Sequence, residues 1–514
     1  MTERIAVLGA GVMGAGIAQL GLSQGFEVLL YDVSVPALER ARRAIAGGLA
    51  SEAPLARLHT TSQLGDLTHL VAVIEAAPEE LALKRELFRY LDEFLAPEVL
   101  LASATSTLPI SALAQSARYP ERIVGVHFLN PAPAVPIVEV VAGFHSGDDA
   151  LARAQDLAVR LGKTPVRTLD RPGYVVHRIA HHYTGSALAL LEEGVASVEA
   201  IDRVLVAAGF PLGPFAHMDR AGLTAIARLA ETLYQGFAQS PRFRPSPLLA
   251  RMLVAGRMGG SAGGFYAPGG ESGAVAPRPG RALKLALVGD TASVAAHEGY
   301  WGDAGHDVVR IVPPMPLATV EQTLADREGV LEVGPAPLDM RLKRLAMLAK
   351  TLPAGAWVAT TELGRTATEL AADTGAPVLT LSDWSPLANA PVWELAASAQ
   401  LSAATKERAL MALGGMKGVV EVEDQVGLVF PRVLATMVNE AAWIVQERVA
   451  EPRDVDAAMR LALGVAQGPL EWAQAIGLHR VLGVLEGLTR ELGDRYRPAP
   501  LLKRLALSGR PFLQ

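Results

Sequence analysis

The sequence predicts an α/β domain, then an all-α domain, and after these a degenerate duplicate of both. Three observations support this prediction. Short apolar runs alternate with helical patterns over residues 1–168, only helical periodicity remains over residues 169–266, and the second half of the chain repeats motifs of the first. Strand–helix alternation is typical of a parallel sheet covered by helices. The 514 residues are enough for several domains.

The elements of the first two domains follow from their apolar patterns. Helical stretches, such as residues 80–94, separate short apolar runs in the first domain. These runs predict buried strands at residues 5–8, 28–31, 70–74, 99–102 and 123–126. In the second domain apolar residues recur at helical spacing, as in Ile179, Tyr183 and Ala187, and strand signals are absent. This domain is therefore expected to be all-helical.

The remaining chain predicts a linker and the duplicate. Residues 267–282 lack periodicity and core-forming residues, which is typical of an interdomain linker. Residues 283–412 and 413–514 predict a degenerate α/β domain and a second helical domain, because they repeat earlier segments. The repeated pairs are residues 5–9 and 285–289, 25–29 and 305–309, 190–202 and 444–456, 213–215 and 468–470, and 244–249 and 497–502.

Composition excludes several function classes. The net charge of −6 argues against a general binder of nucleic acid or of membrane surfaces, because both partners are anionic. The absence of cysteine excludes disulfides, thiolate metal sites and cysteine nucleophiles. His181 and His182 are adjacent on a predicted helix and point apart, so we expect them at a surface or interface and expect no metal site. No apolar run reaches the roughly 20 residues of a membrane span, and no secretory signal pattern is present, so a cytoplasmic location is expected.

A glycine-rich motif follows the first strand and opens a helix. It reads Gly9-Ala-Gly11-Val12-Met13-Gly14. The first glycine permits a tight turn, the second lets the backbone approach a pyrophosphate, and the third lets the helix pack on the strand. Asp32 closes the second strand, where a carboxylate accepts a hydrogen bond from the ribose 2′-hydroxyl. These features predict a Rossmann domain that binds NAD rather than NADP.

The duplicate lacks most of this motif. With an offset of 280 residues, Gly9 corresponds to Gly289. The other two glycines and the acid are replaced by Thr291, Val294 and Val312. Side chains at these positions would block a pyrophosphate, so the second half is predicted not to bind a dinucleotide.

His127 is the candidate catalytic residue. It follows a predicted strand, and the carboxyl edge of such a sheet is where ligands bind. Imidazole titrates near working pH, so His127 can take a hydroxyl proton as a hydride leaves the same carbon. Glu139 is the candidate carboxylate that orients the ring. The residues alone leave open that His127 bonds a backbone carbonyl and that Glu139 lies on a solvated strand face.

These motifs together resemble those of L-3-hydroxyacyl-CoA dehydrogenases, over essentially the whole chain. The resemblance is strongest to the long form that carries a second, degenerate copy, as in 3-hydroxyadipyl-CoA dehydrogenases of phenylacetate catabolism. The segments that carry it are residues 9–14, 75–79 with Lys84, 103–106, 127–131, 172–178 and 209–214.

The resemblance implies NAD-dependent oxidation of the 3-hydroxyl of a 3-hydroxyacyl-CoA to the 3-keto thioester. It implies that His127 is the base, that Glu139 orients it, and that Ser106 contacts the substrate oxygens. The residues implied around the nicotinamide and its ribose are Glu79, Lys84 and Asn130.

Three features depart from the family pattern. Ala104 and His177 replace two asparagines of the family, although a histidine at 177 can still donate a hydrogen bond to a substrate. Residues 41–66 are too few for the helical hairpin that helps the family to hold CoA. These departures keep two alternatives open, an NAD-binding scaffold with weakened catalysis and a dehydrogenase of hydroxyacids that are not linked to CoA.

The duplicate also lacks the catalytic base. When Glu394 is aligned with Glu139, Ser382 stands where His127 stands, and Pro431 takes the place of His177. We therefore expect a structural role for the second half, which would cover the helical face of the first half as a subunit does in a homodimer.

Overall fold

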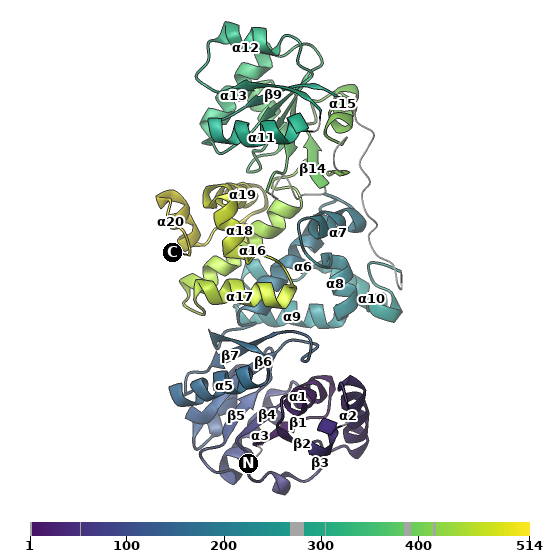
Figure 1. Cartoon of the computed structure of the whole chain (residues 1–514), viewed down its shortest axis with the longest axis vertical. Coiled ribbons are helices and arrows are strands. Elements are labelled where there is room, and N and C mark those ends of the chain that lie inside the picture. Colours follow the sequence, from purple (N-terminus) through teal and green to yellow (C-terminus); the bar gives the residue numbers. More distant parts are fainter. Residues whose placement is uncertain are drawn as a thin grey trace.

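The computed structural model describes residues 3–51, 53–267, 282–303, 305–384, 392–414 and 418–513. Figure 1 shows an α/β domain at each end of an elongated molecule and a helical layer from both halves between them. The predicted fold class is confirmed. Along the chain, a sheet is followed by a group of helices, and a second sheet with the corresponding strand order is followed by a second group of helices. The predicted linker at 267–282 lies almost wholly outside the described residues.

The first half begins with an eight-stranded sheet of order β3-β2-β1-β4-β5-β6-β7-β8. Neighbouring strands are parallel except β6 and β7, which are antiparallel. The strands are β1 (Arg4–Leu8), β2 (Glu27–Tyr31), β3 (Leu58–Thr61), β4 (Ala72–Glu75), β5 (Leu100–Ser103), β6 (Ile123–Phe128), β7 (Ile137–Ala142) and β8 (Thr164–Leu169). Their helices are α1 (Val12–Ser23), α2 (Val35–Gly48), α3 (Leu81–Phe94), α4 (Ile110–Leu113) and α5 (Asp148–Arg160).

The order of the strands positions the site. The chain passes from β1 to β2 on one side, whereas β4, β5 and β6 lie on the other. In open α/β sheets, ligands bind at such a switch point, outside the carboxyl ends of the strands. Between β2 and β3 the described residues form one helix, α2, and a short 3-10 turn, and they contain no helical hairpin.

The helical layer combines elements of both halves. The first half contributes α6 (Val176–Glu192), α7 (Val198–Ala207), α8 (Pro214–Ala221), α9 (Leu223–Gly236) and α10 (Pro247–Val254). The second half contributes α16 (Phe430–Gln446), α17 (Pro452–Leu463), α18 (Pro469–Ile476), α19 (Leu478–Leu492) and α20 (Pro500–Ser508). The central helices α6 and α16 pack against each other and are buried along almost their entire length, including several of their polar side chains.

The contacts between the two halves are reciprocal. Arg178 on α6 lies 2.9 Å from Glu447 of the second half, and Arg432 on α16 lies 2.6 Å from Glu193 of the first. Each pair repeats the other with the halves exchanged, which is the pattern of an isologous dimer interface. The second half therefore covers the helical face of the first half, as predicted.

The histidine pair His181 and His182 is buried at this interface, where His182 lies 3.3 Å from Glu440 of α16. We predicted that these residues lie at a surface or at an interface, and the structure places them at an interface.

The second sheet has seven strands in the order β10-β9-β11-β12-β13-β14-β15. This is the order of the first sheet without a counterpart of β3. The strands are β9 (Lys284–Val288), β10 (Asp307–Ile311), β11 (Gly329–Glu332), β12 (Trp357–Thr360), β13 (Val378–Leu381), β14 (Val392–Ala397) and β15 (Gly418–Glu421). The helices are α11 (Thr291–Asp303), α12 (Leu317–Leu324), α13 (Leu338–Thr351), α14 (Ala367–Thr374) and α15 (Ala403–Gly414). Because β15 follows residue 412, we propose that the last domain division comes after Glu421 and keep the other divisions as predicted.

Candidate active site

The glycine-rich loop leaves an open anion site at the start of α1. Gly9 has a φ of 107°, and a Cβ on Gly14 would lie 1.8 Å from the carbonyl oxygen of Gly9, so neither position accepts a side chain. A Cβ on Gly11 would meet no atom within 4 Å. No side chain caps α1, and Val12 in its first turn is 81% exposed. Free backbone N–H groups at a helix start suit a phosphate, so Gly9, Gly11, Val12, Met13 and Gly14 fit the predicted pyrophosphate site.

Asp32 ties this loop to the end of β2. Its Oδ2 accepts from the backbone N–H of Ala10 at 2.7 Å, and its Oδ1 accepts from Ser34 N–H at 2.8 Å. A carboxylate has about four lone-pair positions, so both oxygens can still accept from ribose hydroxyls. The half-buried Asp32 stands beside the glycine-rich loop, as the NAD prediction requires.

The predicted pair of His127 and Glu139 is present and buried. The antiparallel register of β6 and β7 places the two residues opposite each other, and His127 Nδ1 lies 2.7 Å from Glu139 Oε2. A carboxylate only accepts, so Nδ1 carries the proton and Nε2 is free to take one. Burial tends to raise the pKa of Glu139, but His127 and two backbone N–H groups lower it overall.

The other oxygen of Glu139 holds the helical domain. Oε1 accepts from the backbone N–H of Val175 at 2.8 Å and of Val176 at 3.0 Å, at the start of α6. One carboxylate therefore orients His127 and fixes the helix that follows.

His177 lies in the first turn of α6 and faces His127. The ring centroids of His127 and His177 are 4.8 Å apart. Burial and the charge of His127 lower the pKa of His177 to about 4, so it is neutral at pH 7. Its Nδ1 is buried, and no polar atom in the described part of the chain hydrogen-bonds to it. Buried polar atoms normally have a partner, so this nitrogen is available to a polar ligand.

Glu79 holds the loop that carries Ser106. Its Oε1 accepts from the side chain of Thr105, from the backbone N–H of Ser106 at 3.2 Å, and from both N–H and Oγ1 of Thr107. These bonds lower the pKa of Glu79, with the charge of Lys84, against the opposing effect of burial. Ser106 itself is half-buried, and its backbone is within bonding reach of His177.

Lys84 and Asn130 lie at different depths. Lys84 is 1% exposed, and its Nζ lies 2.6 Å from Glu75 and 3.2 Å from Glu79. It can therefore act on a ligand only through Glu79. Asn130 is exposed, two residues after the end of β6.

Sequence reasoning missed three groups around His127. Thr105 and Thr107 anchor Glu79, and the Tyr174 hydroxyl lies 3.4 Å from the carbonyl oxygens of Thr105 and Leu108. The Tyr174 ring is 5.4 Å from that of His127. Both threonines and Tyr174 stand within or next to the motifs at 103–106 and 172–178, so those motifs were the available signal.

The corresponding loop of the second half carries a carboxylate that the first half lacks. Asp290 occupies the place of Ala10, and its Oδ1 accepts from the backbone N–H of Ser293 at 3.0 Å. Although burial opposes it, this bonding lowers the pKa of Asp290. A fixed negative charge thus caps α11, where a pyrophosphate would need free N–H groups. This supports the prediction that the second half binds no dinucleotide.

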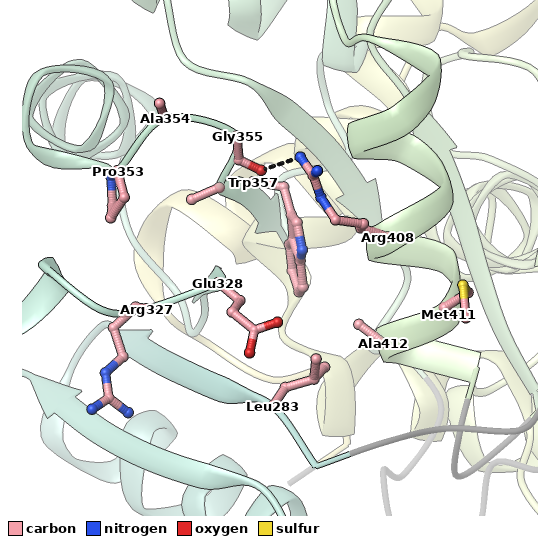
Figure 2. Close-up of a pocket in the computed structure, with 11 residues that line it drawn as sticks. Leu283, Arg327, Glu328, Pro353, Ala354, Gly355, Trp357, Arg408, Met411 and Ala412 are labelled. Atoms are coloured by element: carbon pink, nitrogen blue, oxygen red, sulfur yellow. Dashed lines mark hydrogen bonds between the residues drawn. The ribbon is translucent and has the colours of Figure 1, made fainter.

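A separate hollow of about 370 Å³ lies in the second α/β domain. Figure 2 shows its walls, with Arg408 of α15 donating to the carbonyl of Gly355 at 2.7 Å. Leu283, Glu328 and Trp357 mark the amino ends of β9, β11 and β12 in this wall. The hollow is therefore at the opposite edge of its sheet from the edge that carries the site in the first half.

Two further kinds of feature are absent from the described residues. They contain no group of three or more histidine, aspartate or glutamate residues arranged to hold a metal ion. Within the same residues, no helix has the length and apolar character to cross a membrane.

Comparison with known proteins agrees with this geometry. The family model "3-hydroxyacyl-CoA dehydrogenase, NAD binding domain" matches residues 4–171, and the model of the C-terminal domain of that family matches residues 173–268 and 427–512. The chain is 33% identical to a 3-hydroxyadipyl-CoA dehydrogenase of Escherichia coli, over 98% of both chains. It is 37% identical to a probable 3-hydroxybutyryl-CoA dehydrogenase of Deinococcus radiodurans, over 51% of this chain and 99% of the relative.

Solved structures give the same result. The crystal structure of 3-hydroxybutyryl-CoA dehydrogenase from Escherichia coli matches with a TM-score of 0.79 and 31% identity, over 99% of both chains. The fold, the nucleotide edge and the matches along the whole chain thus agree, and the chain belongs to the NAD-dependent 3-hydroxyacyl-CoA dehydrogenase family.

Proposed function

We propose that the chain catalyses the reversible oxidation of the 3-hydroxyl of a 3-hydroxyacyl-CoA to the 3-keto thioester, with His127 as the base and Glu139 as its orienting partner. The single observation that carries this proposal is the buried 2.7 Å contact between His127 Nδ1 and Glu139 Oε2 at the carboxyl edge of the sheet. When bound there, NAD⁺ supplies the hydride acceptor.

His127 is the better base of the two neighbouring histidines. Glu139 fixes the proton on Nδ1 of His127, so that Nε2 can take the hydroxyl proton, and the carboxylate stabilises the imidazolium that results. His177 has a pKa of about 4 and would hold a proton poorly at neutral pH. We assign it instead a hydrogen bond to a substrate oxygen, made by the buried nitrogen that lacks a protein partner.

Ser106 contributes to the same substrate contact. It lies beside His177, on a loop that Glu79 holds by four hydrogen bonds. A loop fixed in this way needs little reorganisation when substrate binds, which favours catalysis. Lys84 and Glu79 keep the loop in place, and Asn130 stands at the exposed border of the site.

The residues at the switch point fit NAD. The open space above Gly11 and the uncapped start of α1 suit the pyrophosphate, and Asp32 suits a ribose with free hydroxyls. The same carboxylate would repel a 2′-phosphate, so we propose a preference for NAD over NADP.

The proposal so far does not specify which acyl group the substrate carries. The relatives are named for 3-hydroxyadipyl-CoA and 3-hydroxybutyryl-CoA, whose acyl chains differ in length and in a terminal carboxylate. A series of 3-ketoacyl-CoAs, short, long and dicarboxylic, assayed by the loss of NADH absorbance, would rank these chains.

The same assay tests the proposal with acetoacetyl-CoA. Replacement of the base in His127→Ala is expected to lower kcat by about 10²- to 10⁴-fold. Ser382→Ala, the equivalent position of the second half, is the matched control and should retain wild-type activity. A wild type no more active than His127→Ala would reject the proposal, and NAD binding without turnover would indicate a scaffold. Turnover of free 3-hydroxy acids without CoA would indicate a different dehydrogenase.

A further inference from the structure

The second half has a cleft between the carboxyl edge of its sheet and its helical domain, and this cleft shows which positions of the first half correspond to its walls. The second cleft encloses a cavity of about 510 Å³. One wall is the loop at 361–365, after β12, and the opposite wall is helix α19. The α19 residues that line the cavity are His479, Arg480, Gly483, Glu486, Gly487 and Arg490.

Helices α9 and α19 correspond position by position. Each begins directly after a glycine with positive φ, Gly222 at 87° and Gly477 at 101°. The first residue of each helix is a buried leucine, Leu223 or Leu478. The face of α9 that corresponds to the cavity wall therefore consists of Thr224, Ala225, Arg228, Glu231, Thr232 and Gln235, which are all exposed or half-buried.

Helix α9 lies where such a wall must lie. In Figure 1 it borders the side of the helical layer that is turned towards the first α/β domain. A Cβ on Gly173 would approach the side chain of Leu233 to 2.5 Å, so α9 is in close contact with the segment that joins the two domains.

The duplicate indicates where the side chain of Arg228 points. Its counterpart is Gly483, and a Cβ built there meets no atom within 4 Å, so a side chain at this position projects into the cavity. The carbonyl of Gly483 faces Gly364, since a Cβ on Gly364 would lie 2.8 Å from it. In the first half, Gly364 corresponds to Thr107, the neighbour of Ser106. This correspondence places Arg228 on the face of α9 that is turned towards the Ser106 loop.

Arg228 also differs in charge pairing from the arginines of the second cleft. Arg480 is paired with Asp383, and Arg490 lies 3.4 Å from Glu369. In the described part of the chain, Arg228 has neither an ion pair nor a hydrogen bond to another residue. The nearby Glu231 accepts from Gln235 at 2.8 Å, one turn further along α9. Arg228 is thus an exposed arginine whose guanidinium has no partner among the described residues.

We propose that Arg228 binds an anionic group of the acyl-CoA and that this group is the carboxylate at the far end of a dicarboxylic acyl chain. A guanidinium presents a planar pair of donors that matches a carboxylate or a phosphate. A phosphate of CoA offers the same chemistry, so the test separates the two sources. This inference rests on the proposed function, because it takes the acyl-CoA as the ligand of this cleft.

Calorimetric binding of two unreactive ligands, adipyl-CoA and butyryl-CoA, tests the inference. Neither has a 3-hydroxyl, so no turnover is needed. In Arg228→Gln, adipyl-CoA is expected to bind about tenfold or more weakly, whereas butyryl-CoA changes by less than about twofold. Arg228→Lys should keep part of the affinity. Arg251→Gln on α10 removes the same charge from another exposed position and is the control.

Each outcome is decisive. Equal weakening of both ligands in Arg228→Gln assigns the anionic group to a CoA phosphate. Unchanged affinities, or the same change in Arg251→Gln, overturn the inference. Because Arg228 is exposed, its variants should keep the wild-type melting temperature, which excludes misfolding as the cause. Selective loss of adipyl-CoA binding in an enzyme that is inactive on every 3-ketoacyl-CoA would reject the proposed function and retain this assignment.

Discussion

The two halves hold the same buried carboxylate in the same position with different partners. Glu139 and Glu394 lie on equivalent strands, and each accepts hydrogen bonds from two backbone N–H groups at the start of a central helix. In the first half the facing residue is His127, whereas in the second it is Ser382. The carboxylate therefore has a structural role in both halves, as the joint between sheet and helices. Only in the first half does a histidine stand beside it, and we propose that this histidine makes the joint a catalytic pair.

The pKa values of the two carboxylates move in opposite directions. Burial raises the pKa of Glu394 to about 8, because its backbone bonds offset burial only in part. At Glu139 the same burial is outweighed by His127 and the backbone bonds, and the pKa is lowered. The comparison indicates that a buried carboxylate at this joint is tolerated without a cation, but becomes reliably ionised at neutral pH only with one.

The largest expected effect is on kcat, and it distinguishes Glu139 from Glu394. Glu139→Gln removes the acceptor that fixes the tautomer of His127 and stabilises its charged form. We expect kcat with acetoacetyl-CoA and NADH to fall by about 10³-fold. Glu394→Gln, the matched variant, should keep wild-type kcat. Similar losses in both variants would mean that the joint, and not the histidine, controls activity.

The sequence was informative where a function depends on a local pattern. The turn at Gly9, the strand next to His127 and the loss of glycines in the second half all follow from neighbouring residues. The distance between His127 and Glu139 did not, because it depends on the antiparallel register of β6 and β7. The backbone donors Val175 and Val176 have no sequence signature, since every residue except proline carries an N–H.

Contacts distant in sequence were also beyond prediction. Arg178 and Glu440 are separated by 262 positions, and nothing in either segment specifies the other. The duplication predicted that the helical faces would meet, but not which charges would be buried between them. Likewise, Asp290 is one replacement among many in the second half, and its role as a helix cap depends on the backbone of Ser293.

The second prediction concerns the junction of the halves. Glu440 is buried and lies close to Arg178, Arg242 and His182, which lower its pKa against the effect of burial. Glu440→Gln leaves the buried Arg178 and the half-buried Arg242 without this charge, so we expect a loss of about 3 kcal/mol, seen as a lower melting temperature. The side chain of Glu447 is 27% exposed, so Glu447→Gln should cost about 1 kcal/mol or less. Equal shifts in melting temperature would show that burial of Glu440 is unimportant.

The third prediction exchanges the residues that the two halves carry at the starts of α1 and α11. Gly11→Thr copies the second half, and the open space around Gly11 should let the variant fold normally. Its side chain would occupy the pyrophosphate position, so we expect the Kd for NAD, measured by calorimetry, to rise about 100-fold. The reverse change, Thr291→Gly, should create no NAD binding, because Asp290 still caps α11. Wild-type affinity in Gly11→Thr would place the pyrophosphate elsewhere.

The smallest effect is the pH dependence of stability that Glu394 introduces. Its folded pKa of about 8 lies above the value of about 4.3 expected for an unfolded chain, so the folded state binds the extra proton. The contribution is therefore fully present below about pH 4 and is lost as the pH rises through 8. Glu394→Gln mimics the protonated form and should remove this dependence. We expect its melting temperature to exceed that of the wild type at pH 8.5 by a few degrees, and the difference to shrink towards pH 5.5.

Ser382→His should also raise the melting temperature at pH 8.5 relative to the wild type, because a histidine there would lower the pKa of Glu394 as His127 does for Glu139. A difference between wild type and Glu394→Gln that stays constant from pH 5.5 to 8.5 would mean that Glu394 is ionised throughout, and that the two joints are electrostatically alike.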